Sequence, residues 1–286
     1  MALTKVKNLG LGTTDAQGNT LNGTTAGDSF SGTDANNNTL IGKDAGTAIT
    51  TGDENVAVGA DALKANTTAS YNTAVGESAL EVNTTGASNT AVGSRCLDAN
   101  TTGSNNTGVG QGCLTAATTA SNNTAVGINT LSANTTGTNN VALGYQALAL
   151  NTTADHNTAL GRVCLYDNTT GEKNTAVGSG VLANNTTADN NTGLGFEALT
   201  QNTTGFLNTA VGGRASGLNT TGERNTAVGY DALYDNTTGS RNTGLGQNSL
   251  QNNTTASDNT AVGYTALGAN TTGTSNVAVG SYALDA

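Results

Sequence analysis

The sequence predicts an all-β protein, a parallel β-solenoid (β-roll) built from 17-residue rungs. The pentad Asn-(Thr/Val)-(Ala/Gly/Leu)-(Val/Leu/Ile)-Gly occurs fifteen times at an unbroken spacing of 17 residues, from Asn38 to Asn276. The repeat is rich in Asn, Thr, Val and Gly rather than in helix formers, and its apolar residues do not recur three and four apart. Aromatic residues make up only 3% of the chain and tryptophan is absent, so a thick core of large side chains is excluded.

One copy of the repeat shows the complete unit. It has Asn-Thr-Ala-Val-Gly over 225–229, Ala-Leu at 232–233 and Asn-Thr-Thr-Gly over 236–239. Gly and Asn-Thr-Thr-Gly are turn sequences, whereas Thr-Ala-Val and Ala-Leu suit short strands. We therefore expect two strands per rung, with each rung stacked on the one before it.

An unbroken period predicts ladders of identical side chains. Stacked rungs place each residue about 4.8 Å above its counterpart. We expect Asn225 and its counterparts to pass amide hydrogen bonds from rung to rung, and Asn236, Thr237 and Thr238 to form a second ladder at the turn. Gly229 stands at a position that is glycine in all fifteen copies, which indicates either a positive φ or a backbone approach too close for a Cβ atom.

Adjacent apolar residues predict association with other chains. Side chains in a strand alternate between its faces, so Ala227 and Val228, like Ala232 and Leu233, should point to opposite sides. If alanine fills the interior, Val228 and Leu233 form an outward oligomer interface; the opposite assignment leaves an alanine stripe outside, and local bulges could bring both residues inward. We expect a parallel homotrimer first, because in-register ladders suit a rotation axis along the stack.

The two ends depart from the repeat. Residues 1–18 are expected to be an assembly or attachment leader, with aliphatic residues Leu3, Val6, Leu9 and Leu11. Residues 19–37 read as a degenerate capping rung, because the pentad at 19–23 has Asn22 at its fourth position and precedes the next pentad by 19 residues. Residues 38–286 hold the fifteen repeats. The last repeat stops in its second half, so we expect another subunit to cover that edge.

No residue pattern predicts an enzyme, a metal site or a cofactor. Cys96, Cys113 and Cys164 occupy a position that is alanine in other copies, and we expect free buried thiols rather than a bridge between Cys96 and Cys113. His156 is the only histidine and precedes a pentad without a nucleophile beside it. The acidic residues form no recurrent converging pair.

Four aromatic residues share the position after the pentad glycine: Tyr145, Phe196, Tyr230 and Tyr264. They could face a receptor such as a host surface glycan, although packing between chains or a spacer role is the favoured interpretation. The net charge of −10 and the scattered Lys and Arg residues argue against nucleic acid and against an anionic membrane as partners. No stretch has the length and apolarity expected of a membrane insertion.

The repeat resembles those of two families. Asn-Thr-Ala-Val-Gly followed by Ala-Leu is similar to the repeats in the heads of YadA-like trimeric autotransporter adhesins, which are left-handed, trimeric β-rolls. The full unit with its Asn-Thr-Thr-Gly turn is more similar to the repeat arrays of phage tail-fibre proteins, and the start Met-Ala-Leu-Thr-Lys-Val resembles phage appendage proteins. The resemblance covers residues 38–286 and implies a left-handed homotrimer.

The sequence thus favours a structural fibre subunit of a phage virion, a tail fibre or appendage, made in the host cytoplasm. It would act as a rod-like spacer that contributes to host attachment and meets other virion subunits at both ends. The alternatives are a self-assembling extracellular filament or adhesin and, last, an ice-binding solenoid, because the adjacent Thr-Thr residues should point to opposite faces of a curved turn.

Overall fold

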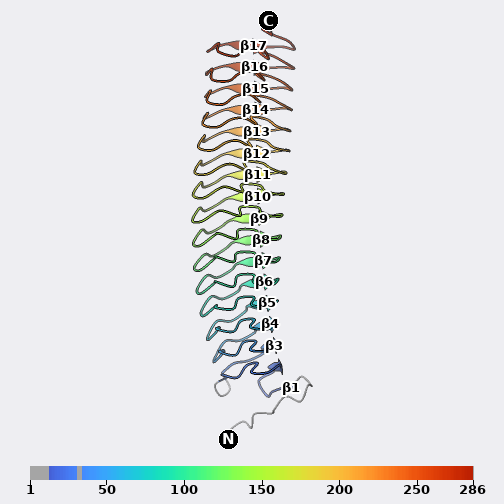
Figure 1. Cartoon of the computed structure of the whole chain (residues 1–286), viewed down its shortest axis with the longest axis vertical. Helices are drawn as coiled ribbons and strands as arrows, with labels where there is room; N and C mark the ends of the chain where they lie inside the picture. Colours follow the sequence, from blue (N-terminus) through green and yellow to red (C-terminus); the bar gives the residue numbers. More distant parts are fainter. Residues whose placement is uncertain (1–12, 31–33, 286) are drawn as a thin grey trace. The chain divides into compact units, whose positions relative to one another are not determined.

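The computed structural model describes residues 13–30 and 34–285, and these residues form β-strands and turns without a helix. The chain divides into two compact units, residues 1–136 and 137–286. Within each unit, strands of three residues follow one another up a stack (Figure 1). The predicted parallel β-solenoid is confirmed.

In the first unit, a parallel sheet runs from β2 to β8. Successive strands pair at an offset of 17 residues, as between Thr73 and Thr90, except that Thr20 of β2 pairs with Thr39 of β3, 19 residues on. The strands are β2 (Thr20–Asn22), β3 (Thr39–Ile41), β4 (Val56–Val58), β5 (Thr73–Val75), β6 (Thr90–Val92), β7 (Thr107–Val109) and β8 (Thr124–Val126).

The second unit repeats this arrangement from β9 to β17. Every neighbouring pair is parallel with the 17-residue offset. The strands are β9 (Val141–Leu143), β10 (Thr158–Leu160), β11 (Thr175–Val177), β12 (Thr192–Leu194), β13 (Thr209–Val211), β14 (Thr226–Val228), β15 (Thr243–Leu245), β16 (Thr260–Val262) and β17 (Val277–Val279).

A short hairpin covers the first edge of the first unit. Strand β1 (Thr13–Thr14) pairs antiparallel with β2, and the Asp15 carboxylate accepts hydrogen bonds from the backbone N–H of Asn19 at 2.8 Å and from its Nδ2 at 3.0 Å. In the expected capping rung at 19–37, strand β2 pairs in parallel with β3 of the next rung. The expected leader residues Leu3, Val6, Leu9 and Leu11 lie outside the described residues.

Each rung contains one strand and not the two expected from the sequence. In the rung that begins at Asn225, the Ala-Leu segment forms turns, with φ of 54° at Asp231 and 52° at Leu233. The N–H of Asp231 donates to Gly213 in the preceding rung, whereas that of Leu233 donates to Ser249 in the following rung. Left-handed residues on both sides of Ala232 remove the strand alternation, so adjacent side chains both turn inward.

The regular rungs share a small core. Alanine at the third and eighth positions, leucine at the ninth and asparagine at the first and twelfth are buried; in the rung of Asn225 these are Ala227, Ala232, Leu233, Asn225 and Asn236. A left-handed conformation costs a non-glycine residue roughly 1–2 kcal/mol. Burying a leucine side chain contributes about 1.5–3 kcal/mol, which offsets that strain.

The first two rungs have a different core. Leu21 and Leu40 replace the third-position alanine, Gly27 and Gly46 replace the ninth-position leucine, and apolar side chains, Phe30 and Ile49, replace the twelfth-position asparagine. A Cβ atom on Gly46 would lie 2.8 Å from both Ile49 Cδ1 and Leu40 Cδ2. The leucine side chain thus fills the rung from the strand instead of from the turn.

Candidate functional site

Two asparagine ladders run up each unit. In the inner ladder, made by the first-position residues, the N–H of Asn225 donates to Oδ1 of Asn208 at 2.9 Å, and its Nδ2 donates to the Gly239 carbonyl at 2.8 Å. Asn242 makes the same bond to Asn225. The Asn225 side chain therefore accepts from the following rung and donates within its own rung, which satisfies groups that would be costly to bury unpaired.

The turn ladder, made by the twelfth-position residues, has the same polarity. Nδ2 of Asn236 donates to Asn219 Oδ1 at 2.8 Å and to the Gly239 carbonyl at 2.9 Å. Thr237 beside it donates from Oγ1 to the Thr254 carbonyl at 3.1 Å. The Thr238 side chain is exposed, and only its backbone N–H bonds to the next rung.

One rung interrupts the turn ladder in the first unit. The twelfth residue there is Ala117, and Oδ1 of Asn100 in the preceding rung is buried without a hydrogen-bond partner. In neighbouring rungs this oxygen accepts from the next asparagine, as Asn83 Oδ1 does from Asn100 at 2.7 Å. The sequence already carried this signal, because Ala117 stands where the repeat has asparagine.

The pentad glycines satisfy both expectations for their position. Gly229 has φ of 134°, and a Cβ atom on it would lie 2.6 Å from the carbonyl carbon and oxygen of Gly246 in the next rung. An L-residue would be strained there and would also collide with the backbone. Gly229 therefore sets how closely successive rungs approach.

The predicted interface residues differ in where they lie. Leu233 is completely buried within its own rung, so the prediction that it faces outward is wrong; the left-handed turn at Asp231 and Leu233 carries it inward, as one of the alternatives allowed. Val228, the third residue of β14, is half-buried on the outer side of the strand.

We call the third residues of the strands the apolar stripe. Leu143, Leu194 and Leu245 in the second unit are 51%, 45% and 42% exposed, and Ile41 and Val109 in the first unit are also exposed. The first residue of nearly every strand is threonine and lies on the same outer face, because residues two apart in a strand share a face. A row of methyl groups thus runs beside a row of hydroxyl groups.

The four candidate receptor-facing aromatics, Tyr145, Phe196, Tyr230 and Tyr264, are exposed and all belong to the second unit. Tyr230 is held by a network that the sequence analysis missed. Arg214 lies between the rings of Tyr230 and Tyr234, with its guanidinium carbon 5.2 Å and 4.7 Å from the two ring centroids. It also forms a two-point ion pair with buried Asp231, which raises the pKa of Arg214.

All three cysteines are free and buried, as expected. Burial raises the pKa of the Cys164 thiol, and a hydrogen bond with Cys113 together with burial raises that of Cys96. Two of the larger eighth-position side chains, Cys96 and Val181, are followed by glycine at the third position of the next rung. A Cβ on Gly108 would lie 2.5 Å from Cys96 Sγ, and a Cβ on Gly193 would lie 2.4 Å from Val181 Cγ1.

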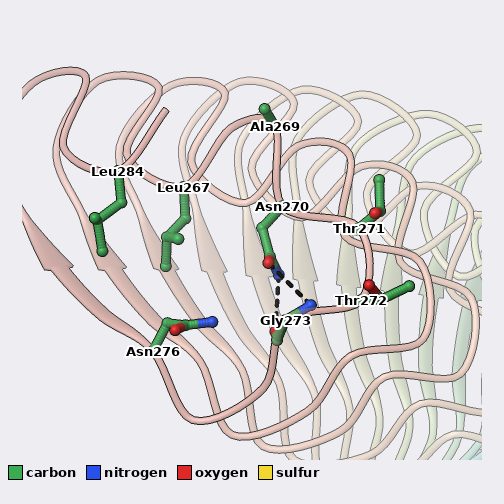
Figure 2. A pocket seen from close by; sticks show the side chains of 8 residues that line it. All are labelled: Leu267, Ala269, Asn270, Thr271, Thr272, Gly273, Asn276 and Leu284. Carbon is green, nitrogen blue, oxygen red and sulfur yellow. Dashed lines mark hydrogen bonds between the residues drawn. The ribbon is translucent and has the colours of Figure 1, made fainter. Parts of the chain in front are cut away.

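A pocket lies at the last rung of the second unit (Figure 2). Asn270 bonds to both polar groups of the Gly273 backbone there, and Leu267 and Leu284 point into the same space. In earlier rungs the turn of the next rung fills this position, as Asn270 does above Asn253. The pocket is therefore a stacking surface without a charged group; its lining residues are Leu267, Ala269, Asn270, Thr271, Thr272, Gly273, Asn276 and Leu284.

Comparisons with known proteins gave no match to a family model, a curated protein or a solved structure. Within residues 13–30 and 34–285, no three His, Cys, Asp or Glu side chains are grouped so that they could hold a metal ion. No helix in that part of the chain is long and apolar enough to cross a membrane. The exposed apolar and aromatic side chains described above are members of the apolar stripe and the four aromatic residues of the second unit.

Proposed function

We propose that the chain is a structural fibre subunit, a tail fibre or appendage of a phage virion, that associates with copies of itself as a parallel, left-handed homotrimer. The observation that supports this most is the apolar stripe, an outward-facing row of half-buried and exposed Val, Leu and Ile side chains at the third strand position from β3 to β17. Apolar rows of this extent are unusual on a monomer and suit association with another chain. Each copy presents the same row at the same spacing, so copies fit in register.

Sedimentation of a stripe variant tests this association. Val228→Asp combined with Leu245→Asp should convert a trimer into monomers, because association would bury charges without partners. The control is Val228→Thr with Leu245→Thr, since threonine already occupies the neighbouring outward position of these strands. A wild-type chain that sediments as a monomer, or an Asp variant that stays trimeric, would contradict the proposal.

Micrographs distinguish the virion subunit from the alternative, a self-assembling extracellular filament. A fibre subunit should give particles of one length at every protein concentration. A filament-forming protein should give particles that lengthen as the concentration rises. The stacking surface at Leu267 and Leu284 is the contact through which such growth would occur.

A specific observation also favours the third candidate, an ice-binding solenoid. The threonines that begin most strands form a row on the outer strand face beside the apolar stripe, interrupted by valine at β4, β9 and β17. This row differs from the Thr-Thr pair at the turn, whose side chains should point to opposite faces. Thermal hysteresis of the purified protein tests this function, and Thr209→Lys with Thr226→Lys should abolish it if it is present.

A further inference from the structure

We propose that Phe196, Tyr230 and Tyr264 form a binding row for an extended, neutral, β-1,4-linked glycan. All three occupy the position after the pentad glycine and are 57%, 52% and 42% exposed. Consecutive members are 34 residues apart in sequence, which is two rungs. Two rungs correspond to about 9.6 Å along the stack. The proposal concerns a different set of side chains from the apolar stripe and does not depend on the proposed function.

The spacing identifies the shape of the ligand. In an extended β-1,4-linked chain each sugar is turned over relative to the last, so the same face recurs once per disaccharide, close to the two-rung distance. A sugar face with axial C–H groups stacks on an aromatic ring. Aromatic rings two rungs apart can therefore each stack on every second sugar of one straight chain, whereas a helical α-1,4-linked chain would leave the row after one contact.

Glycine keeps the path open between Phe196 and Tyr230, whereas an exposed glutamine side chain stands between Tyr230 and Tyr264. The same position in the intervening rungs holds Gly213 and Gln247. A Cβ atom on Gly213 would lie 3.2 Å from Cδ2 and 3.5 Å from Cε2 of Tyr230, so this ring rests on the Gly213 backbone. A side chain at position 213 would displace it. Glycine at position 213 thus allows the central ring to lie along the stack.

Tyr230 is fixed before any ligand arrives. Arg214 packs on its ring, and the carboxylate of Asp231, which is only 4% exposed, holds Arg214 in place. A ring that is already ordered loses little conformational entropy on binding. Arg214 keeps a partly exposed side chain and can donate hydrogen bonds to sugar hydroxyl groups.

The charge of the chain excludes acidic polysaccharides. The full chain carries −10, and the second unit alone has ten Asp and Glu against five Lys and Arg. A polyanion would be repelled by this surface. A neutral chain of glucose or N-acetylglucosamine units fits the rings and the charge together.

Calorimetric titration of the full chain with cellohexaose, chitohexaose and maltohexaose tests the proposal. At least one of the two β-1,4-linked hexasaccharides should bind, and maltohexaose should bind at least tenfold more weakly. Tyr230→Ala should reduce affinity at least tenfold, and Gly213→Val should do the same by moving the ring. Failure of both β-1,4-linked hexasaccharides to bind, or equal binding of maltohexaose, would overturn the proposal.

Tyr145→Ala is the matched control. Tyr145 has the same rung position and is 47% exposed, but it lies three rungs before Phe196, outside the two-rung spacing. Its replacement should change affinity less than twofold. Equal losses for Tyr145→Ala and Tyr230→Ala would refute the spacing argument. If Tyr230→Ala instead left binding intact and changed the sedimentation coefficient, the ring would belong to an interface between copies and the glycan row would be rejected.

Discussion

The first two rungs and the regular rungs that follow them in the first unit share a parallel three-residue strand but have different interiors. The rungs that begin at Asn19 and Asn38 fill the space near the turn with Phe30 and Ile49, and no amide ladder passes through them there. From Asn66 onward the same position in this unit carries asparagine, except at Ala117. A rung can therefore be built with either interior, and the inner ladder from Asn19 upward is the polar element that both regions share.

The two kinds of rung differ in the position of their buried leucine and in which residue takes the left-handed conformation. In the first rungs it stands in the strand, where its conformation is relaxed, and glycine takes the left-handed position at Gly27 and Gly46. In the regular rungs leucine itself takes that position, as Leu63 does with φ of 51°. The regular interior accepts backbone strain, and alanine in the strand leaves room for the turn leucine.

Replacing the twelfth-position residue by leucine should give the largest difference in stability loss between the regular rungs and the first two rungs. Asn83→Leu removes bonds to Asn66 at 3.0 Å, to Gly86 at 2.9 Å and from Asn100 at 2.7 Å. Losing these bonds leaves buried polar groups unpaired and should cost about 3–5 kcal/mol. Ile49→Leu should cost less than about 1.5 kcal/mol. Urea unfolding measures both, and equal costs would show that the two interiors do not differ in this way.

A second test converts one interior into the other. Gly46→Leu introduces the regular leucine beside Leu40 and Ile49, where there is no room, and should cost about 1–3 kcal/mol. Adding Leu40→Ala restores the regular combination of small strand residue and large turn residue. The double variant should be more stable than Gly46→Leu alone by thermal denaturation; if it is less stable, the two positions do not compensate each other.

In the regular rungs, a larger side chain at Cys96 is likewise accommodated by a smaller residue at Gly108 in the next rung. Gly108→Ala would place a Cβ 2.5 Å from Cys96 Sγ, and this overpacking should cost about 1–2 kcal/mol. Cys96→Ala in the same chain should recover most of the loss. Gly244→Ala is the control, because its nearest contact is longer, at 3.0 Å to Ser249 Oγ. A double-mutant cycle with no coupling between positions 96 and 108 would contradict this account.

The smallest expected effect is a gain in stability. Ala117→Asn supplies the missing amide to Asn100 Oδ1 and closes the gap in the turn ladder, which should stabilise the chain by about 1 kcal/mol. Ala116→Asn, at the neighbouring half-buried position, should change stability by less than about 0.5 kcal/mol. Thermal denaturation of the two variants shows whether the gain in stability comes from completing the ladder or from an added asparagine at either position.

The periodicity predicted the stack, because residues 17 apart in an unbroken repeat occupy equivalent places in successive rungs. It did not predict the shape of the turn. Strand alternation assigned Leu233 to the outside, but the left-handed residues Asp231 and Leu233 reverse that assignment. Their conformation is held by hydrogen bonds to Gly213 and Ser249 in other rungs, and no local propensity indicates it.

The candidate sites also have features that the sequence predicts and features that depend on contacts between stacked rungs. The exposure of Tyr230 followed from its place after the turn glycine, whereas its fixation by Arg214 depends on residues in two rungs that touch only when stacked. The hydrogen bonds of Asp15 were also not predicted, since an aspartate shortly before a pentad occurs at several places in the chain. Its role becomes visible only when the donors of Asn19 are seen to point toward it.

The polarity of the asparagine ladders gives each stack an electrical direction. In both ladders a side-chain amide donates toward the preceding rung, as Nδ2 of Asn38 does to Asn19 and Nδ2 of Asn236 does to Asn219, so the side-chain dipoles add along an unbroken ladder as peptide dipoles do in a helix. The start of the first unit is then partially positive, and the carboxylate of Asp15 stands there. If a rung were added in the opposite orientation, the hydrogen-bond donors of its asparagines would face the donors of the existing rung. Rungs can therefore extend such a stack in one orientation only, and the two faces of every rung differ in sign.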